Sequence, residues 1–349
     1  MQKDISRRSV LIGTAGIVAA PIVLSASRSA AKSDSVTIVS YGGSYQDATV
    51  KAVFDPFTKE TGIKVQIVPY PGLDKVKAML LTGNIEIDIY LSADEESAAG
   101  SKQGFWEKLD PSLFDLKDLK VQPASDYVTY EIYSRGISWD PKKFGPGKHP
   151  TTFAEFFDLQ KFPGRRAMRA AATGTLETAL AADGVAPKDI YPLDLNRAFK
   201  ALDRIKSQIV WSANTPQDVS LLQVGEVDFS IATVNRVKVT TEAGGGVPLA
   251  YSFEQNLHGG VTLQVVKGAR NKESAMKLIA YYLRPEVQTR LCDLVGNGPV
   301  SKKGSAMLSP NVSKWQPDFN NPKSVYSNGT YWAENHEAVT RRFQEWKLT

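Results

Sequence analysis

The sequence has little of the side-chain chemistry that most enzymes use. One cysteine and three histidines occur in 349 residues, and His149, His258 and His336 are too far apart to give a metal-ligand spacing. Cys292 lies in an apolar helical pattern, so we expect a buried thiol and no internal disulfide. Neither a Gly-x-Ser-x-Gly nucleophile elbow nor a Gly-x-x-x-x-Gly-Lys phosphate loop is present. We therefore expect no enzyme activity, no cofactor and no metal site.

Concentrated positive charge is also lacking. The chain has 42 Lys and Arg against 37 Asp and Glu, a net charge of +5. Residues 1–31 contain four basic residues and one acid, a net +3, so the rest of the chain carries only +2. Nucleic-acid binding requires clustered Lys and Arg, and no such cluster occurs. We expect no nucleic-acid partner.

The first 31 residues have the pattern of an export signal. Ser6-Arg7-Arg8 precedes an apolar run from Val10 to Leu24, and small residues continue through Ala31. The run is too short for a membrane-spanning helix, although an uncleaved anchor is the alternative. No cysteine follows it, so a lipid anchor is not supported. The pattern predicts a twin-arginine signal, cleavage near Ala31 and a periplasmic location.

The mature chain begins with a strand, a glycine-rich turn and a helix. Val36–Ser40 is β-branched, Tyr41-Gly42-Gly43-Ser44 follows, and apolar residues then recur at helical spacing. Pro56 inside this helical pattern predicts a kink or two consecutive helices. Ile63–Val68 completes a βαβ unit and predicts a largely parallel sheet. The turn is a candidate ligand site because ligands bind at the carboxyl ends of such strands; a connection without a ligand is the alternative.

Further along, two segments suit a connection between two domains. Ile85–Leu91 is a third strand, and Asp94 after it is either a helix cap or a ligand contact. Tyr127–Trp139 is long enough to leave one domain and enter another, and the 318 residues after Ala31 (349 less 31) favour two lobes. We expect His258-Gly259-Gly260 to be a flexible crossing back, followed by a strand at Val261–Val266.

In the second half of the chain, polar residues again follow predicted strands. Arg169 ends the strand within 162–171, and Thr173 comes shortly after it. Asn235 and Arg236 follow the apolar strand Val227–Thr233. Each arginine is either solvated or faces a ligand; an arginine at a strand end can bind a carboxylate through two hydrogen bonds.

Four segments carry a resemblance that spans essentially the whole mature chain. Tyr41–Gly62, Gly225–Phe229, Gly268–Gln288 and Gly298-Pro299-Val300 resemble periplasmic solute-binding proteins of the spermidine/putrescine type. The resemblance implies a two-lobed, type II-like α/β fold with two crossing segments. It also implies a monomer that delivers a small-molecule ligand to the membrane permease of an ABC transporter. The predicted division is 32–136 plus 259–306 for lobe one, and 137–258 plus 307–349 for lobe two.

The predicted ligand differs from that of the polyamine binders. Where their pattern has acidic and aromatic residues, this chain has Arg169, Arg236, Gly259 and Val261. Arginines repel polyamines and pair with acids, so we expect a small organic anion or a zwitterion such as an amino carboxylate. Asp94 or Glu131 would receive its amine.

Alternatives to this ligand prediction stay open. They are a polyamine binder, a ferric-ion binder using paired tyrosines, and a secreted hydrolase. The predicted ligand-binding residues are Tyr41, Ser44, Tyr45, Asp94, Tyr133, Arg169, Thr173, Asn235, Arg236 and His258.

Overall fold

The computed structural model describes residues 35–349, so the predicted twin-arginine signal lies outside the described residues. No helix within 35–349 is long and apolar enough to cross a membrane. The strands form one mixed sheet in the order β2-β1-β3-β9-β4-β7-β5-β6, with β8 and β10 paired to β4 and β11 to β9. The strands are β1 (Ser35–Ser40), β2 (Lys64–Pro69), β3 (Ile89–Ala93), β4 (Val128–Trp139), β5 (Arg166–Arg169), β6 (Ile209–Ser212), β7 (Phe229–Thr233), β8 (Ala250–Tyr251), β9 (Leu257–Val265), β10 (Gly298–Pro299) and β11 (Val325–Tyr326).

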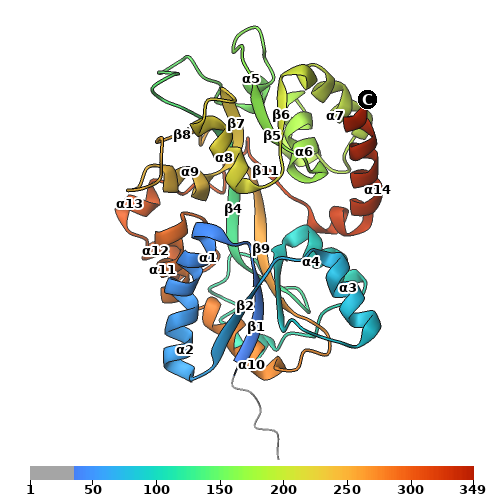
Figure 1. Cartoon of the computed structure of the whole chain (residues 1–349), viewed down its shortest axis with the longest axis vertical. Coiled ribbons are helices and arrows are strands. Elements are labelled where there is room, and N and C mark those ends of the chain that lie inside the picture. The colour runs from blue at the N-terminus through green and yellow to red at the C-terminus, as the bar shows by residue number, and fades with distance from the viewer. Residues whose placement is uncertain (1–34) are drawn as a thin grey trace, which may run out of the picture. The chain divides into compact units, whose positions relative to one another are not determined.

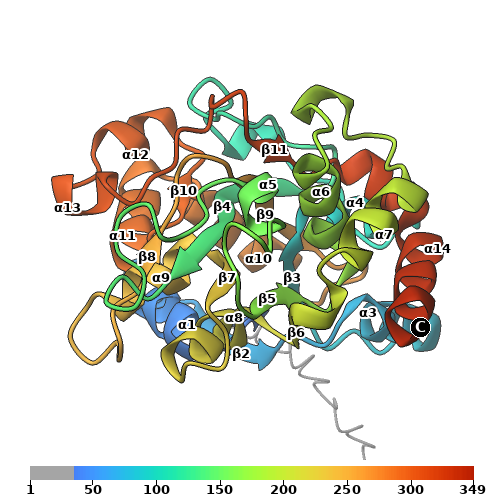
Figure 2. The same ribbon diagram turned by 90° about the horizontal axis from the view of Figure 1, so that it is seen from above.

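Helices flank both halves of this sheet (Figures 1 and 2). The α-helices are α1 (Gly43–Thr49), α2 (Asp55–Thr61), α3 (Leu73–Thr82), α4 (Asp94–Lys102), α5 (Phe153–Phe156), α6 (Ala172–Ala182), α7 (Leu195–Asp203), α8 (Thr215–Gln223), α9 (Val234–Thr240), α10 (Lys272–Tyr282), α11 (Pro285–Val295), α12 (Lys302–Ala306), α13 (Pro310–Ser313) and α14 (Gly329–Leu348). A π-helical turn, η1 (Val50–Phe54), joins α1 to α2, and short 3-10 helices occur at Pro111–Leu113, Pro187–Asp189 and Lys206–Gln208.

Two antiparallel strands, β4 and β9, connect two lobes along the long axis of the described chain (Figure 1). Residues 128–135 of β4 pair with β9, and its last five residues pair with β7. The prediction of one long strand between two domains is therefore confirmed. Because β4 and β9 are hydrogen-bonded to each other where they cross, they form a two-stranded hinge rather than two separate linkers.

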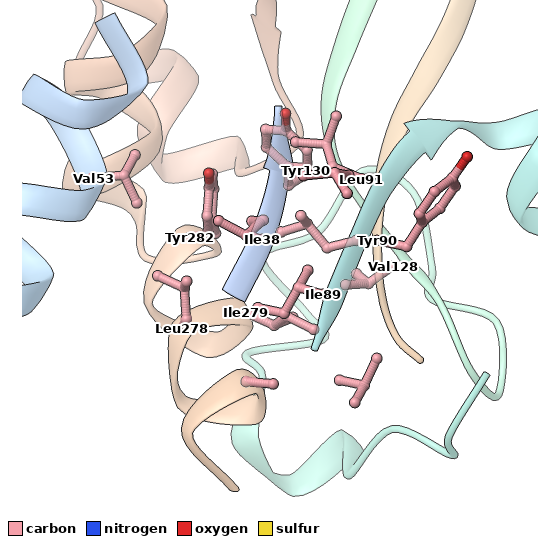
Figure 3. Close-up of a cluster of buried hydrophobic side chains, with 14 of the residues drawn as sticks. Ile38, Val53, Ile89, Tyr90, Leu91, Val128, Tyr130, Leu278, Ile279 and Tyr282 are labelled. Atoms are coloured by element: carbon pink, nitrogen blue, oxygen red, sulfur yellow. The ribbon is translucent and has the colours of Figure 1, made fainter. Parts of the chain in front are cut away.

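The first lobe is built on a parallel βαβ unit, as the sequence predicts. β1 pairs in parallel with β2 and with β3. Ile38 of β1 and Ile89 of β3 are fully buried, and Figure 3 shows them with Leu278 and Tyr282 of α10 in one apolar cluster. Burial of several large apolar side chains stabilises this lobe, since each contributes roughly 1.5–3 kcal/mol.

The second lobe has apolar clusters on both faces of its sheet. β5 pairs in parallel with β6 and with β7. One cluster joins the sheet to α5, α6, α7 and α14, and includes the fully buried Trp332 and Phe343. The other lies under α8 and α9 and includes Val234 and Val237. When helices cover both faces of a parallel sheet, the carboxyl ends of its strands stay uncovered along one edge, which is where ligands bind in such sheets.

The helical pattern after β1 is broken at Pro56, as predicted. The chain passes from α1 through the π-helical turn η1 into α2, with Pro56 in the first turn of α2. Proline lacks the N–H that an α-helix uses, so the turn before it adopts a wider hydrogen-bond pattern. The three segments follow one another without a loop.

Two strand boundaries differ from the predictions. The chain crosses back to the first lobe at His258-Gly259-Gly260 as predicted, but β9 begins at Leu257, so this crossing is part of the strand and the prediction that it is flexible is wrong. Gly259 is opposite Tyr133 of β4, and a Cβ at Gly259 would lie 2.3 Å from the Tyr133 hydroxyl. The absence of a side chain at Gly259 therefore leaves room for the ring of Tyr133 on the paired strand. β3 begins at Ile89, four residues later than predicted, and the carboxylate of Asp88 just before it accepts the N–H of Thr37 at 2.9 Å.

The C-terminal helix α14 contacts both lobes. It packs along α4 (Figure 1), where Gly329 lies close to Asp94. Its Trp332 also donates a hydrogen bond of 2.8 Å to Glu177 of α6. The assignment of 307–349 to lobe two stays a prediction, since this helix lies against the first lobe as well.

Candidate functional site

The carboxyl ends of parallel strands from both lobes meet beside the hinge. β1 and β3 end at Ser40 and Ala93 in the first lobe, and β5 and β7 end at Arg169 and Thr233 in the second. Arg135 of β4 is the register partner of Thr233. Polar side chains from five elements are thereby brought to one region between the lobes.

A side-chain hydrogen bond joins the two lobes beside this region. A guanidinium nitrogen of Arg236, on α9, donates a hydrogen bond of 3.0 Å to the Ser44 hydroxyl, on α1. A narrow crevice lies beside this contact, with a free volume of about 10 Å³, room for about one water molecule. It is lined by Ser44, Tyr45, Asn235, Arg236, Val239, Leu294 and Val295. Two of the predicted residues, Ser44 and Arg236, are therefore paired across the two lobes.

Arg169, the last residue of β5, is held by the second lobe. Its side chain donates to the carbonyl of Ala213 at 3.3 Å and lies 3.7 Å from the carboxylate of Asp218. Its Nε is buried and has no hydrogen-bond partner. Burial, and the positive charge of Arg135, lower the pKa of Arg169, while Asp218 opposes the shift. An additional anion beside Arg169 would be stabilised by this incomplete pairing.

Arg135 is a functional candidate that the sequence interpretation missed. Its guanidinium lies 5.2 Å from the ring centroid of Tyr133, two residues away on the same face of β4. A Cβ at Gly174, whose φ is +83°, would lie 2.6 Å from a terminal nitrogen of Arg135. Its Nε is also buried and unpartnered. An arginine inside the long crossing strand, where Glu131 is the other charged residue, was the signal for it.

The first lobe supplies acidic and aromatic groups to the same region. The Glu95 side chain, on α4, is buried, and its Oε2 has no hydrogen-bond partner. Burial, and the neighbouring Asp94, raise the pKa of Glu95 well above its usual range. The Tyr133 hydroxyl is likewise buried without a partner, whereas Tyr41 is 42% exposed and its ring centroid lies 5.3 Å from that of Tyr70.

Asp94 and Glu95 both lie in the first turn of α4 but differ in their hydrogen-bond partners. The Asp94 carboxylate accepts the backbone N–H of Glu95 at 3.0 Å, and burial raises the pKa of Asp94. Asp94 thus has a backbone partner, and the unpaired oxygen belongs to the next residue. Glu95 was not among the predicted residues.

Three residues considered for the site make hydrogen bonds within the protein, although the Nε2 atom of His258 is buried without a partner. The Tyr45 hydroxyl bonds with Tyr130 and, at 3.2 Å, with Glu131. Glu131 is 1% exposed and also accepts from Asn297, so it lies in the first lobe's interior and not at its surface. The ring Nδ1 of His258 is 2.7 Å from the Ser134 hydroxyl, and burial lowers the pKa of His258 to about 4.

The remaining predicted residues flank the arginines. Thr173 precedes Gly174 in the non-helical start of α6, and Asn235 accepts the backbone N–H of Arg236 at 2.9 Å. Whether these residues, Tyr45 and His258 contact a ligand stays a prediction. Within 35–349 no group of three or more His, Cys, Asp or Glu side chains is placed to hold a metal ion.

A separate surface hollow of about 540 Å³ lies on the second lobe. Its acid, Asp183, pairs with Arg197 at 2.7 Å and with Arg204 at 2.8 Å. Both carboxylate oxygens are thereby occupied by exposed partners, and this hollow does not share residues with the region between the lobes.

Comparisons with known proteins agree with this architecture. The family model described as bacterial extracellular solute-binding protein matches residues 52–320. The chain is 32% identical over 329 residues to the γ-aminobutyric acid-binding protein of Pseudomonas aeruginosa PAO1, covering 90% of this chain and 92% of that protein. It is 23% identical to the spermidine/putrescine-binding periplasmic protein of Escherichia coli K12, covering 78% and 85%.

Among solved structures, the binding protein AgtB from A. tumefaciens R10 in complex with agropinic acid has a TM-score of 0.80 and 33% identity, covering 90% of this chain and 99% of that one. The chain belongs to the bacterial extracellular solute-binding proteins. The predicted two-lobed α/β fold and the resemblance to this family are confirmed.

Proposed function

We propose that this chain is the periplasmic substrate-binding component of an ABC importer and that it captures a small zwitterion bearing a carboxylate and an amine. The observation that carries the proposal is a set of buried, unpartnered polar atoms of both charge types from the two lobes: Glu95 Oε2, Arg135 Nε and Arg169 Nε. A buried polar atom without a partner costs about 1–3 kcal/mol, so a ligand that satisfies these atoms would be stabilised.

The carboxylate of the ligand is assigned to the arginines. Arg135 and Arg169 lie close enough to repel each other electrostatically, and Arg236 lies on α9, the helix that follows the neighbouring strand β7. A carboxylate between such groups forms charge-assisted hydrogen bonds and relieves their repulsion. A polyamine, which carries only positive charge, would increase it.

The amine of the ligand is assigned to Glu95, with the rings of Tyr41 and Tyr133 beside it. Burial and the neighbouring Asp94 raise the pKa of Glu95, and the positive charge of Arg135 opposes the shift only in part, so the charged form of Glu95 lacks a full counterion. An ammonium group would supply that counterion, and aromatic faces add a favourable cation–π interaction. The acid on lobe one and the arginines on lobe two would then both bind one ligand, which favours the closed arrangement of the lobes.

Two relatives support this ligand class by what they bind. One is named for γ-aminobutyric acid, a zwitterion of this kind, and another was solved with agropinic acid. Polyamine binding is the alternative, because a more distant relative is named for spermidine and putrescine. The unpartnered arginine atoms favour the acid.

The other parts of the proposal follow from the family and the sequence. Export through the twin-arginine signal, a monomeric state and a membrane permease as partner complete the proposed role. The chain would bind and release its ligand without changing it.

A thermal-shift screen of the mature protein tests the proposed ligand class. A ligand that binds only the folded state raises the unfolding midpoint by mass action. We expect γ-aminobutyrate and related amino carboxylates to raise the midpoint, and putrescine and spermidine to leave it unchanged. A shift with polyamines and none with the acids would overturn the proposal.

A further inference from the structure

We propose that Asp218 sets the charge selectivity of the site: its buried carboxylate offsets part of the arginines' positive charge, so that a ligand with one carboxylate is preferred over a ligand with two. This inference rests on the proposed function, because it assumes that the arginines face the bound acid. Asp218 is a positioning and specificity residue here, and the arginines are the groups that touch the ligand.

The position of Asp218 supports this role. It lies in the first turn of α8, is fully buried, and accepts a hydrogen bond from the Ser212 hydroxyl at the end of β6. Its second oxygen has no hydrogen bond and lies 3.7 Å from a terminal nitrogen of Arg169. At that distance the pair interacts mainly through charge, so this terminal nitrogen and the Nε of Arg169 stay available for a ligand, while the other terminal nitrogen donates to Ala213.

The influence of Asp218 extends to all three arginines. It opposes the lowering of the pKa of Arg169 and of Arg236 that burial causes. At Arg135 burial alone would lower the pKa, and Asp218 is among the negative groups that raise it. One buried carboxylate therefore reduces the positive potential of the whole arginine group.

A second acid near the arginines, Glu177, has its carboxylate engaged in other hydrogen bonds. Glu177 of α6 also acts on Arg135, but its carboxylate accepts hydrogen bonds from the backbone N–H of Gly174 at 2.7 Å, from Tyr191 at 2.6 Å and from Trp332 at 2.8 Å. These bonds disperse the charge of Glu177. On the first lobe Asp94 and Glu95 are the acids of the site, and the latter is assigned to the amine.

The consequence is a limit on the negative charge that the site accepts. With Asp218 ionised, one ligand carboxylate compensates much of the remaining positive charge. A second carboxylate would enter a region whose positive potential Asp218 has already reduced, and would lose its hydration without full compensation. Removing the charge of Asp218 should therefore favour the dicarboxylate most.

Asp218→Asn tests this reasoning, because it removes the charge and keeps an oxygen that can accept from Ser212. The probes are γ-aminobutyrate and glutamate, which differ by one carboxylate, measured by calorimetry in the full mature chain. We expect the affinity of γ-aminobutyrate relative to that of glutamate to fall by at least ~10-fold in the variant. A change of this size is what the loss of one nearby charge in a partly buried site produces. Burial raises the pKa of Asp218 to about 6, and the hydrogen bond from Ser212 lowers it in part, so all variants are compared at pH 8. At that pH Ser212→Ala, which loses the hydrogen bond and keeps the charge, should leave the ratio unchanged.

A purely structural role would give a different result. If Asp218 only holds Arg169 in place, the variant weakens both probes by the same factor and the ratio stays constant, which would overturn the inference. An equal fall in the ratio for Ser212→Ala would overturn it as well. The unfolding midpoint of each variant reports whether the fold is retained.

A second pair of probes separates this inference from the proposed function. Acetate and malonate also differ by one carboxylate and carry no amine. If γ-aminobutyrate does not bind the wild type but Asp218→Asn shifts the acetate to malonate ratio toward malonate, the proposed function fails and the inference stands. If γ-aminobutyrate binds and neither ratio changes, the inference fails alone; if nothing binds and no ratio changes, both fail.

Discussion

Glu131 offers a test of the electrostatic reasoning that does not require a ligand. It lies on β4 in the interior of the first lobe, 1% exposed, and accepts hydrogen bonds from Tyr45 and Asn297. Burial raises the pKa of Glu131 from 4.5 to about 7, although those two hydrogen bonds lower it in part. The substitution Glu131→Gln removes the titrating proton and keeps a side chain of the same shape.

The sign of the effect follows from proton uptake. Below pH 4.5 Glu131 is protonated in both the folded and the unfolded state, so its ionisation does not change the free energy of unfolding. Between pH 4.5 and pH 7 the unfolded chain loses the proton while the folded chain keeps it, and stability falls as the pH rises. Above pH 7 the loss of unfolding free energy is complete. It amounts to about 3 kcal/mol, since one pKa unit corresponds to about 1.4 kcal/mol.

The assay is the unfolding midpoint of the wild type and of Glu131→Gln at pH 4.5 and pH 8. We expect the wild type to lose more stability than the variant over this interval, by on the order of 5 °C. Glu337→Gln, an exposed change on α14, is the matched control and should follow the wild type. Parallel curves for wild type and Glu131→Gln would refute the assignment of a protonated, buried Glu131.

Three further predictions concern the site. Arg169→Ala and Arg236→Ala should each weaken binding of an acidic ligand by about 2–5 kcal/mol by calorimetry, because a buried ligand charge loses its partner, whereas Arg197→Ala on the surface should not; wild-type affinity in both site variants would exclude the arginine clamp. Glu95→Gln should weaken γ-aminobutyrate by about 1.5–3 kcal/mol and leave butyrate unchanged, and an equal loss for both would exclude Glu95 as the amine partner. Gly174→Ala and Gly184→Ala both place alanine at positive φ and should each cost about 1–2 kcal/mol of stability, but only the former, whose Cβ meets Arg135, should reduce ligand affinity; equal affinities in the two variants would count against Arg135.

The fold could be predicted from the sequence because its signals are local. The β-branched runs, the glycine stops and Pro56 each act over a few residues, and the structure follows them at β1, α2 and β4. β9 was the exception. Glycines at 259 and 260 suggest flexibility when considered alone, but a Cβ at Gly259 would meet the ring of Tyr133 and a Cβ at Gly260 would meet Thr129, both on the paired strand.

The site was predicted only in part, because ligand contacts depend on side-chain direction. Arg169 and Arg236 follow strands, and the rule that strand ends carry ligands finds them. Arg135 lies within a strand, and its face depends on the pairing with β7 and β9. Asp94 and Glu95 are adjacent in sequence but about 100° apart around a helix, so the sequence alone does not decide which carboxylate is left unpartnered.

Calorimetric titration of the mature protein with γ-aminobutyrate, butyrate and butylamine tests the central claim most directly. The three compounds share a four-carbon chain and carry both charged groups, the carboxylate alone or the amine alone. The account predicts that γ-aminobutyrate binds at least ~100-fold more tightly than either of the others, because arginines on one lobe and Glu95 on the other each need a partner. Tighter binding of butylamine than of γ-aminobutyrate would contradict it.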